Sequence, residues 1–360
     1  MGIPRLLPFL RSISRPRHLC EYKGSVAGID GHVWLHRSIY TDAENFASGF
    51  DVNSHVRYFV RRIRKIVTSG IRPVVVFDGA DLPAKRTTHR NRSSNRAVSM
   101  GRAVALRETG LCSESYNEFA KATDLRFGLV RDIMEALREE GIEAVVAPYE
   151  ADAQLTLLSK LGAVDFVMTE DSDLLVYGCT RVLFKWDPDS MFGIEVSGSL
   201  VNAIPFSGMS HNDAVTACIL AGSDYSPGIR GIGISKAIDL VKCCSQDTFG
   251  AAQLEEVTHK ISQRAPFDID SGTLIDSLRV AKWVFQHQTV FQPNDTSGLI
   301  PLNPYDGEEI TRYAEYLGRI YDNTIAEGVY RGRVHPVTLS IYVEPDGSVK
   351  SKFSNIVFNS

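Results

Sequence analysis

The stretch Pro73-Val-Val-Val-Phe77-Asp78-Gly79 decides the fold. Its apolar run does not alternate with polar residues, which is typical of a central parallel strand that is covered on both faces. Similar short runs rich in β-branched residues recur at 26–29, 142–147, 164–168 and 181–186. Between these runs, residues 56–67 and 130–137 place apolar side chains at the spacing of a helix face. Strands that alternate with helices predict an α/β fold with a mostly parallel, twisted sheet flanked by helices.

Length and composition limit the class of protein. The chain has 360 residues, of which 44% are hydrophobic, enough for one large α/β unit or for two or three domains. A net charge of −4 argues against coating nucleic acid through bulk positive charge, so any such binding must use local basic patches. The six cysteines lack metal-site spacing, which favours reduced thiols inside a cell. No segment approaches the length of a membrane span, and we expect no membrane partner.

Acidic residues follow the predicted strands at three places. Asp30 follows the run at 26–29, Asp78 follows the run that ends at Phe77, and Asp171 comes shortly after 164–168. The carboxyl ends of parallel strands share one edge of a sheet, and ligands bind at that edge. With the acids that flank predicted helices, the candidate set is Asp30, Asp78, Glu150, Asp152, Asp171, Asp173 and Asp224.

Each of these acids alone could cap a helix or form a turn. Gathered at one edge, they would repel one another strongly unless cations neutralised them. An all-oxygen ligand set without His or Cys favours Mg²⁺ or Mn²⁺ over zinc. Two such ions stabilise the attacking and leaving oxygens of an in-line phosphoryl displacement. The sequence therefore predicts a two-metal phosphodiesterase.

Two further features predict contacts with a nucleic-acid backbone. The glycine-rich stretch from Gly228 to Lys236 lies between two helical patterns, where backbone N–H groups could bind a phosphate; a plain interhelical turn is the alternative. Basic residues cluster at Arg57, Arg61, Arg62, Arg64 and Lys65, and again at Lys85, Arg86, Arg90, Arg92, Arg96 and Arg102. We interpret the first cluster as a solvated helix face that could also contact DNA. The second lies in residues 79–122, a polar stretch that we interpret as a solvated lid able to reach the metal site.

With these residues identified, the chain resembles the structure-specific 5′ nuclease superfamily, and within it the branch that contains exonuclease 1. The resemblance rests on MGIPRLLPFL, GIDGHVWLHR, PVVVFDG, APYEADAQL, TEDSDLLVYG and AGSDY followed by GIRGIGISKA, and on VFQP with LIPLNPY at 290–305. It implies a PIN-like 5′ nuclease fold with a helical arch at about 79–125 and a helix-two-turn-helix at about 211–245. It also implies one nuclease domain over residues 1–350, built from regions 1–105 and 130–245, with a helical and irregular part at 246–360 that wraps the core.

The resemblance also implies roles for single residues. The seven acids match the ligands of two Mg²⁺ ions, for which Mn²⁺ substitutes, and Lys85 and Arg92 join Asp78 and Asp171 at catalytic positions. The implied DNA contacts are Gly2, His32, His36, Arg96, Gly231, Gly233, Ser235 and Lys236. Gly228 and Ile232 would offer carbonyl oxygens to K⁺ or Na⁺. This chain departs from the family at His32, where the family has Tyr, and at Gly31, where it has Ala.

The implied function is a metal-dependent 5′→3′ exonuclease on double-stranded DNA that also cuts 5′ flaps. Its substrates would be DNA with 5′ ends, nicks, gaps or flaps. It would act in the nucleus, in mismatch repair, recombination and end resection. Mismatch-repair proteins and a sliding clamp are candidate partners, although we do not expect the family's usual partner-binding tail within these residues. The alternatives are a flap endonuclease proper, a PIN-like ribonuclease and a non-catalytic DNA-junction-binding protein. The glycine-rich stretch disfavours the ribonuclease, and the complete set of acids disfavours the non-catalytic protein.

Overall fold

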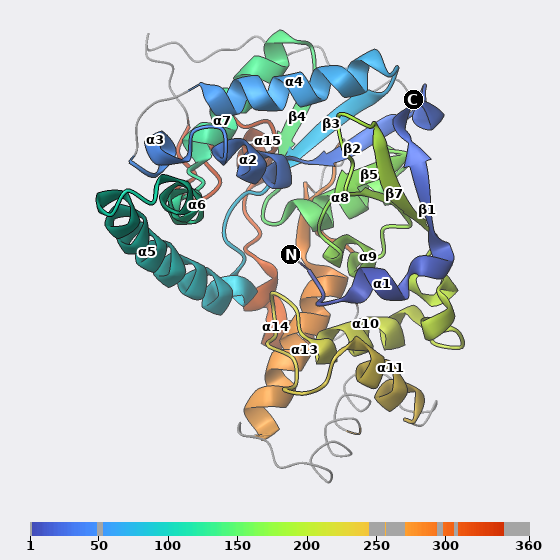
Figure 1. Cartoon of the computed structure of the whole chain (residues 1–360). Coiled ribbons are helices and arrows are strands. Elements are labelled where there is room, and N and C mark those ends of the chain that lie inside the picture. Colours follow the sequence, from blue (N-terminus) through green and yellow to red (C-terminus); the bar gives the residue numbers. More distant parts are fainter. Residues whose placement is uncertain are drawn as a thin grey trace.

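The computed structural model describes residues 2–48, 53–244, 256, 271–293, 298–305 and 309–341. Within these residues one sheet of seven strands has the order β1-β7-β6-β5-β2-β3-β4 (Figure 1). The strands are β1 Ser14–His18, β2 Val26–Asp30, β3 Arg72–Phe77, β4 Glu143–Val146, β5 Phe166–Thr169, β6 Arg181–Phe184 and β7 Phe192–Ser197. Neighbours from β6 to β4 pair in parallel, whereas β7 is antiparallel to both of its neighbours. The predicted fold class is confirmed, and β1 and β7 are strands that the sequence did not predict.

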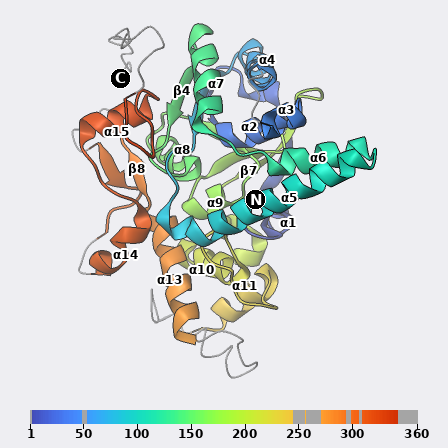
Figure 2. The same ribbon diagram turned by 90° about the vertical axis from the view of Figure 1, so that its left-hand side faces the viewer.

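Helices cover both faces of this sheet (Figures 1 and 2). The α-helices of the described residues are α1 Leu6–Phe9, α2 Gly31–Ile39, α3 Ala43–Ala47, α4 Ser54–Thr68, α5 Arg86–Glu108, α6 Cys112–Ala122, α7 Phe127–Glu139, α8 Ala151–Lys160, α9 Asp173–Tyr177, α10 His211–Ala221, α11 Ile234–Lys242, α13 Ser271–His287, α14 Glu309–Leu317 and α15 Asn323–Tyr330. One core joins α2, α4 and α7 to the sheet, and a second joins α8, α9, α10 and α13 to it. No helix among the described residues is both long and apolar enough to cross a membrane.

Helix α4 confirms the predicted apolar face but corrects the basic one. Phe59, Ile63 and Ile66 are buried in the core shared with the sheet. Arg62, however, is only 5% exposed, and its guanidinium carbon lies 4.7 Å from the ring centroid of Trp34 and 4.9 Å from that of Trp186. The prediction of a solvated basic face is therefore wrong for Arg62, because cation–π contacts with aromatic rings replace water around its charge.

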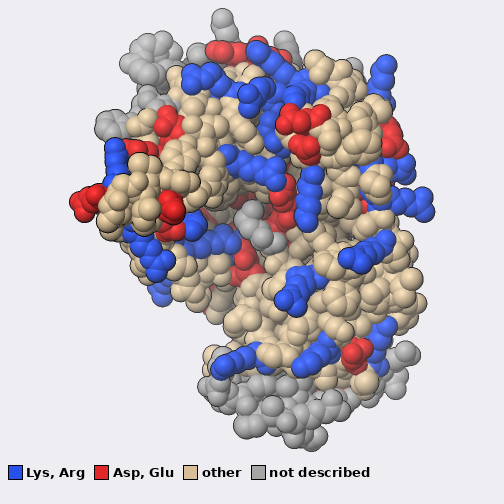
Figure 3. All heavy atoms as spheres, in the orientation of Figure 1, with Lys and Arg blue, Asp and Glu red and all other residues tan. Residues whose placement is uncertain are grey.

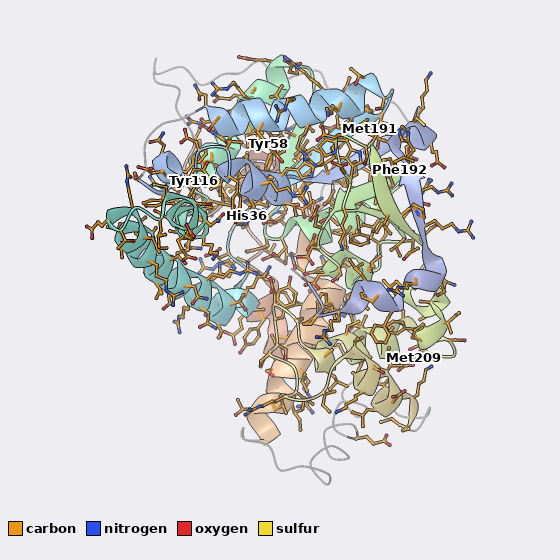
Figure 4. All side chains as sticks on the ribbon, viewed as in Figure 1. His36, Tyr58, Tyr116, Met191, Phe192 and Met209 are labelled. Atoms are coloured by element: carbon orange, nitrogen blue, oxygen red, sulfur yellow. The ribbon has the colours of Figure 1, made fainter. Side chains whose placement is uncertain are left out.

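The predicted lid at residues 79–122 is a pair of helices, α5 and α6, that pack along each other and project from the body (Figure 2). Helix α5 is largely exposed, as its polar composition predicted. The expectation of little core is only partly right, since Ala103 and Phe119 pack with Ile39 and Phe46 from α2 and α3. The hydroxyl of Tyr116 on α6 also donates to the backbone carbonyl of residue 40 at 3.0 Å (Figure 4). We call residues 79–122, which include α5, α6 and the short turn that ends at Lys85, the arch.

The glycine-rich stretch connects α10 and α11, as the sequence predicted. Ser210 caps α10, because its Oγ accepts a hydrogen bond from the backbone N–H of Asp213 at 3.1 Å while Asp213 accepts one from the N–H of Ser210 at 2.9 Å. Farther along the chain, β8 Thr289–Phe291 and β9 Leu299–Pro301 form a hairpin, and β8 packs on α8. Much of the predicted part at 246–360 lies outside the described residues, namely 246–255, 257–270, 294–297, 306–308 and 342–360.

Candidate active site

The carboxyl ends of three parallel strands bring acids to one edge of the sheet. Asp30 ends β2, Asp78 directly follows β3, and Asp171 comes two residues after β5. Because β2 pairs in parallel with both β3 and β5, these ends lie side by side, as the sequence predicted. Glu150 precedes α8, Asp152 lies in its first turn, Asp173 begins α9 and Asp224 follows α10. Figure 3 shows acidic side chains inside a hollow on this face, with lysine and arginine side chains around its rim.

Hydrogen bonds hold several of these carboxylates in place. Thr169 Oγ1 donates to Asp30 Oδ2 at 2.7 Å and accepts from the N–H of Asp171 at 3.1 Å. The N–H of Ala151 donates to Asp78 Oδ1 at 2.7 Å. Thr169 was not among the predicted site residues, although its place at the end of β5, two residues before Asp171, was a usable signal. The end of β5 thus holds the Asp30 carboxylate, and the start of α8 holds the Asp78 carboxylate.

Burial, and after it the charges of neighbouring carboxylates, raises the pKa of several of these acids. Burial, and after it the charge of Asp78, raises the pKa of Asp30 to about 7. Burial and neighbouring carboxylates raise the pKa of Asp152 and of Asp173 well above the usual value. Burial also raises the pKa of Asp171. Each shift means that the ionised form is unfavourable at this position unless cations lie nearby.

Lys85 lies among the acids although its residue is only 9% exposed. Its Nζ donates to Glu150 Oε2 at 2.6 Å and lies 3.0 Å from Asp224 Oδ2. Burial by itself would lower the pKa of Lys85, but Glu150 and Asp224 raise it above its usual value. Arg92 also donates to Asp224 Oδ2 at 2.7 Å, and Lys85 and Arg92 outweigh burial to lower the pKa of Asp224. The two arch cations therefore face the acidic site, where the sequence placed them.

The acids fit a hard divalent cation, although the site is not a closed cage. In the described part of the chain, no three His, Cys, Asp or Glu side chains already stand close enough together to hold a metal ion. Lys85 lies between Glu150 and Asp224, which keeps those two carboxylates from meeting. Oδ1 of Asp173 is buried and has no hydrogen-bond partner among the described residues. A buried carboxylate oxygen without a partner is costly, and a cation would satisfy it.

Two histidines on α2 lie between the acids and the arch. His32 Nδ1 accepts a hydrogen bond from the backbone N–H of Asp78 at 2.9 Å. His36 lies on the side of α2 that faces the hollow (Figure 4). Partial burial among protein atoms, followed by the nearby charges of His32, Arg92 and Arg96, lowers the pKa of His36 to about 4. At neutral pH His36 is therefore uncharged.

The other residues expected to contact DNA take two positions. Gly2 has a φ of +83° and lies so close to Asp171 and Ser172 that a side chain there would collide with both. Arg96 lies in α5, 3.3 Å from Asp124. Gly231 and Gly233 in the α10–α11 connection are exposed, and so are Ser235 and Lys236 in the first turn of α11. The structure therefore places one group at the acidic site or on the arch, and a second group at the end of the α10–α11 connection and the start of α11.

The two residues expected to bind a monovalent cation flank the tight turn before α11. Gly228 has a φ of +66°, and a Cβ there would lie 2.5 Å from the backbone nitrogen of Gly222, so only glycine fits without a shift. The N–H of Ile232 donates to the carbonyl of Ile229 at 2.9 Å, which closes the next turn. Their role as cation ligands stays a prediction.

Two family models match this chain: residues 1–99 match the XPG N-terminal domain, and residues 141–224 match the XPG I-region. Exonuclease 1 of Xenopus laevis is 32% identical over 338 residues, which cover 93% of this chain and 45% of that protein. Exodeoxyribonuclease 1 of Schizosaccharomyces pombe is 30% identical over 360 residues, which cover 98% of this chain and 60% of that protein. The chain thus spans about half the length of these curated relatives.

Solved structures share the fold. The catalytic core of Rad2 in complex with DNA substrate matches with a TM-score of 0.58 at 20% identity, covering 91% of this chain and 99% of that one. The Holliday junction-resolving enzyme GEN1 in complex with product DNA and a Mg²⁺ ion matches with a TM-score of 0.52 at 18% identity, covering 81% and 66%. At such identities the likeness concerns the architecture, a mostly parallel sheet flanked by helices.

Proposed function

Because this chain belongs to the XPG family of nucleases, we propose that it is a metal-dependent 5′→3′ exonuclease on double-stranded DNA that also cuts 5′ flaps. The observation that carries this proposal is that the elements bearing the seven acids and the two arch cations converge at one edge of the sheet, where the acids influence one another's charge. The Xenopus and fission-yeast relatives are exonucleases by name, and the Rad2 core was solved with a DNA substrate, which supports DNA as the substrate class.

We propose that two Mg²⁺ ions bind the seven acids, and that Mn²⁺ substitutes for Mg²⁺ because it also takes oxygen ligands. The carboxylate-only donor set and the unpartnered oxygen of Asp173 support this assignment. Such ions, when bound, polarise a phosphodiester and make water a better nucleophile. The protein's part is to hold the acids at fixed positions: Thr169 fixes Asp30, and the N–H of Ala151 fixes Asp78.

The arch cations would then act on the phosphate that is cut. Lys85 and Arg92 now bind Glu150 and Asp224, and each can exchange a carboxylate for a phosphate oxygen by a side-chain rotation. Positive charge held at this place stabilises the negative charge that develops on the phosphate during hydrolysis. Thr88 keeps the start of α5 at the site, because its Oγ1 donates to the carbonyl oxygen of Asp224 at 2.7 Å.

Away from the acids, two surfaces would hold the DNA. Near the cut end, the contacts would come from Gly2, His32, His36 and Arg96. On the uncut duplex they would come from Gly231, Gly233, Ser235 and Lys236, with K⁺ or Na⁺ on the carbonyl oxygens of Gly228 and Ile232. The exposure of the second group and the glycine N–H groups there support contact with a DNA backbone.

The wider setting follows from the family resemblance. We propose that the protein acts in the nucleus, in mismatch repair, recombination and end resection, with mismatch-repair proteins and a sliding clamp as partners. We also propose that residues 1–350 act as one nuclease domain. Strands from regions 1–105 and 130–245 share a single sheet, and the later hairpin packs on α8, which supports one cooperative unit.

One gel assay tests the proposed activity. A 5′-phosphorylated blunt duplex, a 5′-flap duplex and an RNA duplex of the same sequence are incubated with the protein in Mg²⁺ or in EDTA. We expect cleavage of both DNAs in Mg²⁺, none in EDTA, and little cleavage of the RNA. Asp171→Ala should slow cleavage by about a thousandfold or more, since an acid at the site is lost.

The matched control is Asp189→Ala, which also removes an aspartate, but from a surface loop where its side chain is 90% exposed. Cleavage by this variant should equal that of the wild type. Activity that persists in EDTA would contradict the metal assignment. A preference for RNA would contradict the assignment of the substrate.

A further inference from the structure

Buried polar and aromatic side chains connect Lys85 to the end of α13. The Nζ of Lys85 lies 5.6 Å from the ring centroid of Tyr225. The hydroxyl of Tyr225 is 2.6 Å from that of Tyr177, and the hydroxyl of Tyr177 donates to Gln288 Oε1 at 2.6 Å. Tyr225 follows Asp224, Tyr177 ends α9, and Gln288 directly follows α13. Segments far apart in the sequence therefore meet beneath the acidic site.

The hydrogen bonds in this group have a fixed order. A tyrosine hydroxyl has one hydrogen, and Tyr177 gives its hydrogen to Gln288, so Tyr225 must donate to Tyr177. Phe285 contacts both rings at steep angles, with centroid distances of 5.1 Å to Tyr225 and 5.0 Å to Tyr177. Hydroxyl and ring contacts together fix the plane of Tyr225, and with it the ring face near Lys85.

Packing does not explain Gln288. The residue is fully buried, and its Nε2 has no hydrogen-bond partner among the described residues. An unpaired polar group in such a place destabilises the fold, and a leucine or methionine of similar size would avoid that cost. What the amide does provide is the acceptor for Tyr177. This favours a role for Gln288 in ordering the two tyrosines.

Lys85 needs an anchor that does not depend on the acids. Its ammonium group is a point charge on a flexible stem, and ion pairs with Glu150 and Asp224 leave it free to follow either carboxylate. Cations bound by those carboxylates would also compete with it. An aromatic ring attracts an ammonium group within about 6 Å, whether or not the carboxylates are engaged. The face of Tyr225 meets this condition.

We propose that Tyr225, Tyr177 and Gln288 form a positioning chain that holds the Lys85 ammonium group where it meets the scissile phosphate. This inference rests on the proposed nuclease function. All three act through Lys85, and none of them touches the reacting atoms. Gln288 lies far beyond the residues that the two family models match, so the C-terminal part of the chain would contribute to the rate of the chemical step.

A double-mutant cycle tests the chain. Tyr225→Leu, Tyr225→Phe and Gln288→Leu are each made in the wild type and in Lys85→Met, and single-turnover cleavage of the blunt duplex is measured in Mg²⁺. Tyr225→Leu should slow the wild type about 30-fold, the rate equivalent of a desolvated cation–π contact of about 2 kcal/mol. Tyr225→Phe and Gln288→Leu, which keep the ring near Lys85, should slow it several-fold. DNA affinity measured in Ca²⁺ should stay within about twofold.

The decisive readout is the Lys85→Met background, in which none of the three changes should slow cleavage further. Equal slowing with and without the lysine would overturn the positioning chain. Tyr330→Leu is the matched control: Tyr330 is also buried in the C-terminal part and packs on Phe291, and its loss should leave the rate unchanged. Should Tyr225→Leu unfold, the two variants that preserve volume decide the matter. Failure of the wild type to cut the duplex would refute the nuclease proposal itself.

Discussion

At position 31, a methyl group would lie 2.6 Å from two ring carbons of Phe77 and 3.0 Å from the carbonyl oxygen of Val76. Phe77 is fully buried at the end of β3, so its ring has no room to move aside. Glycine lets the first turn of α2 lie directly against that strand, next to Asp30. The departure from the family's alanine is therefore a packing requirement of this chain.

This requirement predicts that Gly31→Ala destabilises the fold by about 1–3 kcal/mol, the usual cost of overpacking a core. Gly128→Ala is the matched control, since Gly128 also lies in the first turn of a helix but has open space around it. Its stability should stay level or rise slightly. The measurement is the urea midpoint of both variants, and equal midpoints for Gly31→Ala and the wild type would contradict the packing argument.

Single residues also show which features of the site could be predicted from the sequence alone. The acids could be found because Asp30 and Asp78 end runs that read clearly as buried strands. The contacts of Lys85 could not, because its partners Glu150 and Asp224 lie 65 and 139 positions away. Arg62 was misjudged for the same reason: the rings that enclose it come from residues 34 and 186. The sequence shows where the charged residues are, but it does not show which distant side chains contact them in the folded protein.

At the scale of elements, helix α5 of the arch has a weak point at Gly101. A Cβ there would meet nothing within 4 Å, and the position is inside a helix of 23 residues. Glycine inside a helix costs roughly 0.5–1 kcal/mol relative to alanine. The arch thus carries a site at which local opening is easier than its length suggests.

Gly101→Ala should therefore slow amide hydrogen exchange in α5 by up to about fivefold, the factor that corresponds to 1 kcal/mol. Exchange in α7 should not change. Gly128→Ala serves as the reciprocal control, since it belongs to α7 and should leave α5 as it was. Unchanged exchange in α5 would mean that helix propensity does not limit its opening.

Strands and helices were predicted correctly where the local hydrophobic pattern matched the packing that the element has in the fold. Strand β3 is apolar throughout, as a strand covered on both faces must be. Strand β1 is Ser14-Arg-Pro-Arg-His18, which has no apolar alternation and contains a proline. It is a strand only because it pairs with β7 at the edge of the sheet, where a missing N–H is tolerated. The composition of residues 79–122 indicated only a solvated lid, because α6 supplies the packing that the polar sequence of α5 lacks. The helices of the arch were implied by the family resemblance.

For the whole molecule, the buried acids link metal binding to pH. An unfolded aspartate has a pKa near 3.9, whereas burial and Asp78 raise the pKa of Asp30 to about 7 in the folded protein. A raised folded-state pKa gives a stabilising contribution that is complete below about pH 4 and is lost as the pH rises through about 7. Asp152, Asp171 and Asp173 shift in the same direction.

We therefore expect the difference in Tm between Mg²⁺ and EDTA to grow from pH 5 to pH 8, since the cation replaces the protons that the acids lose. The gain should be on the order of a few kcal/mol at pH 8. The contribution of His36 to the pH dependence of stability cancels in this difference, because its lowered pKa affects the Tm in Mg²⁺ and in EDTA alike. In Asp30→Asn the Tm difference between Mg²⁺ and EDTA should grow less from pH 5 to pH 8, because one titrating carboxylate is missing. A Tm difference that stays constant across this pH range would contradict the link.

The pairing of β1 with β7 joins residues 14–18 to residues 192–197, and it has a consequence for how the protein is made in a cell. At about 5–20 residues per second, a ribosome completes β7 roughly 10–40 s after β1. During that time the nascent strand has no partner and meets chaperones and other chains. Arg15, Pro16 and Arg17 make it a poor template for aggregation. The polar sequence of β1, which made the strand hard to predict, therefore also lowers its tendency to aggregate before β7 is synthesised.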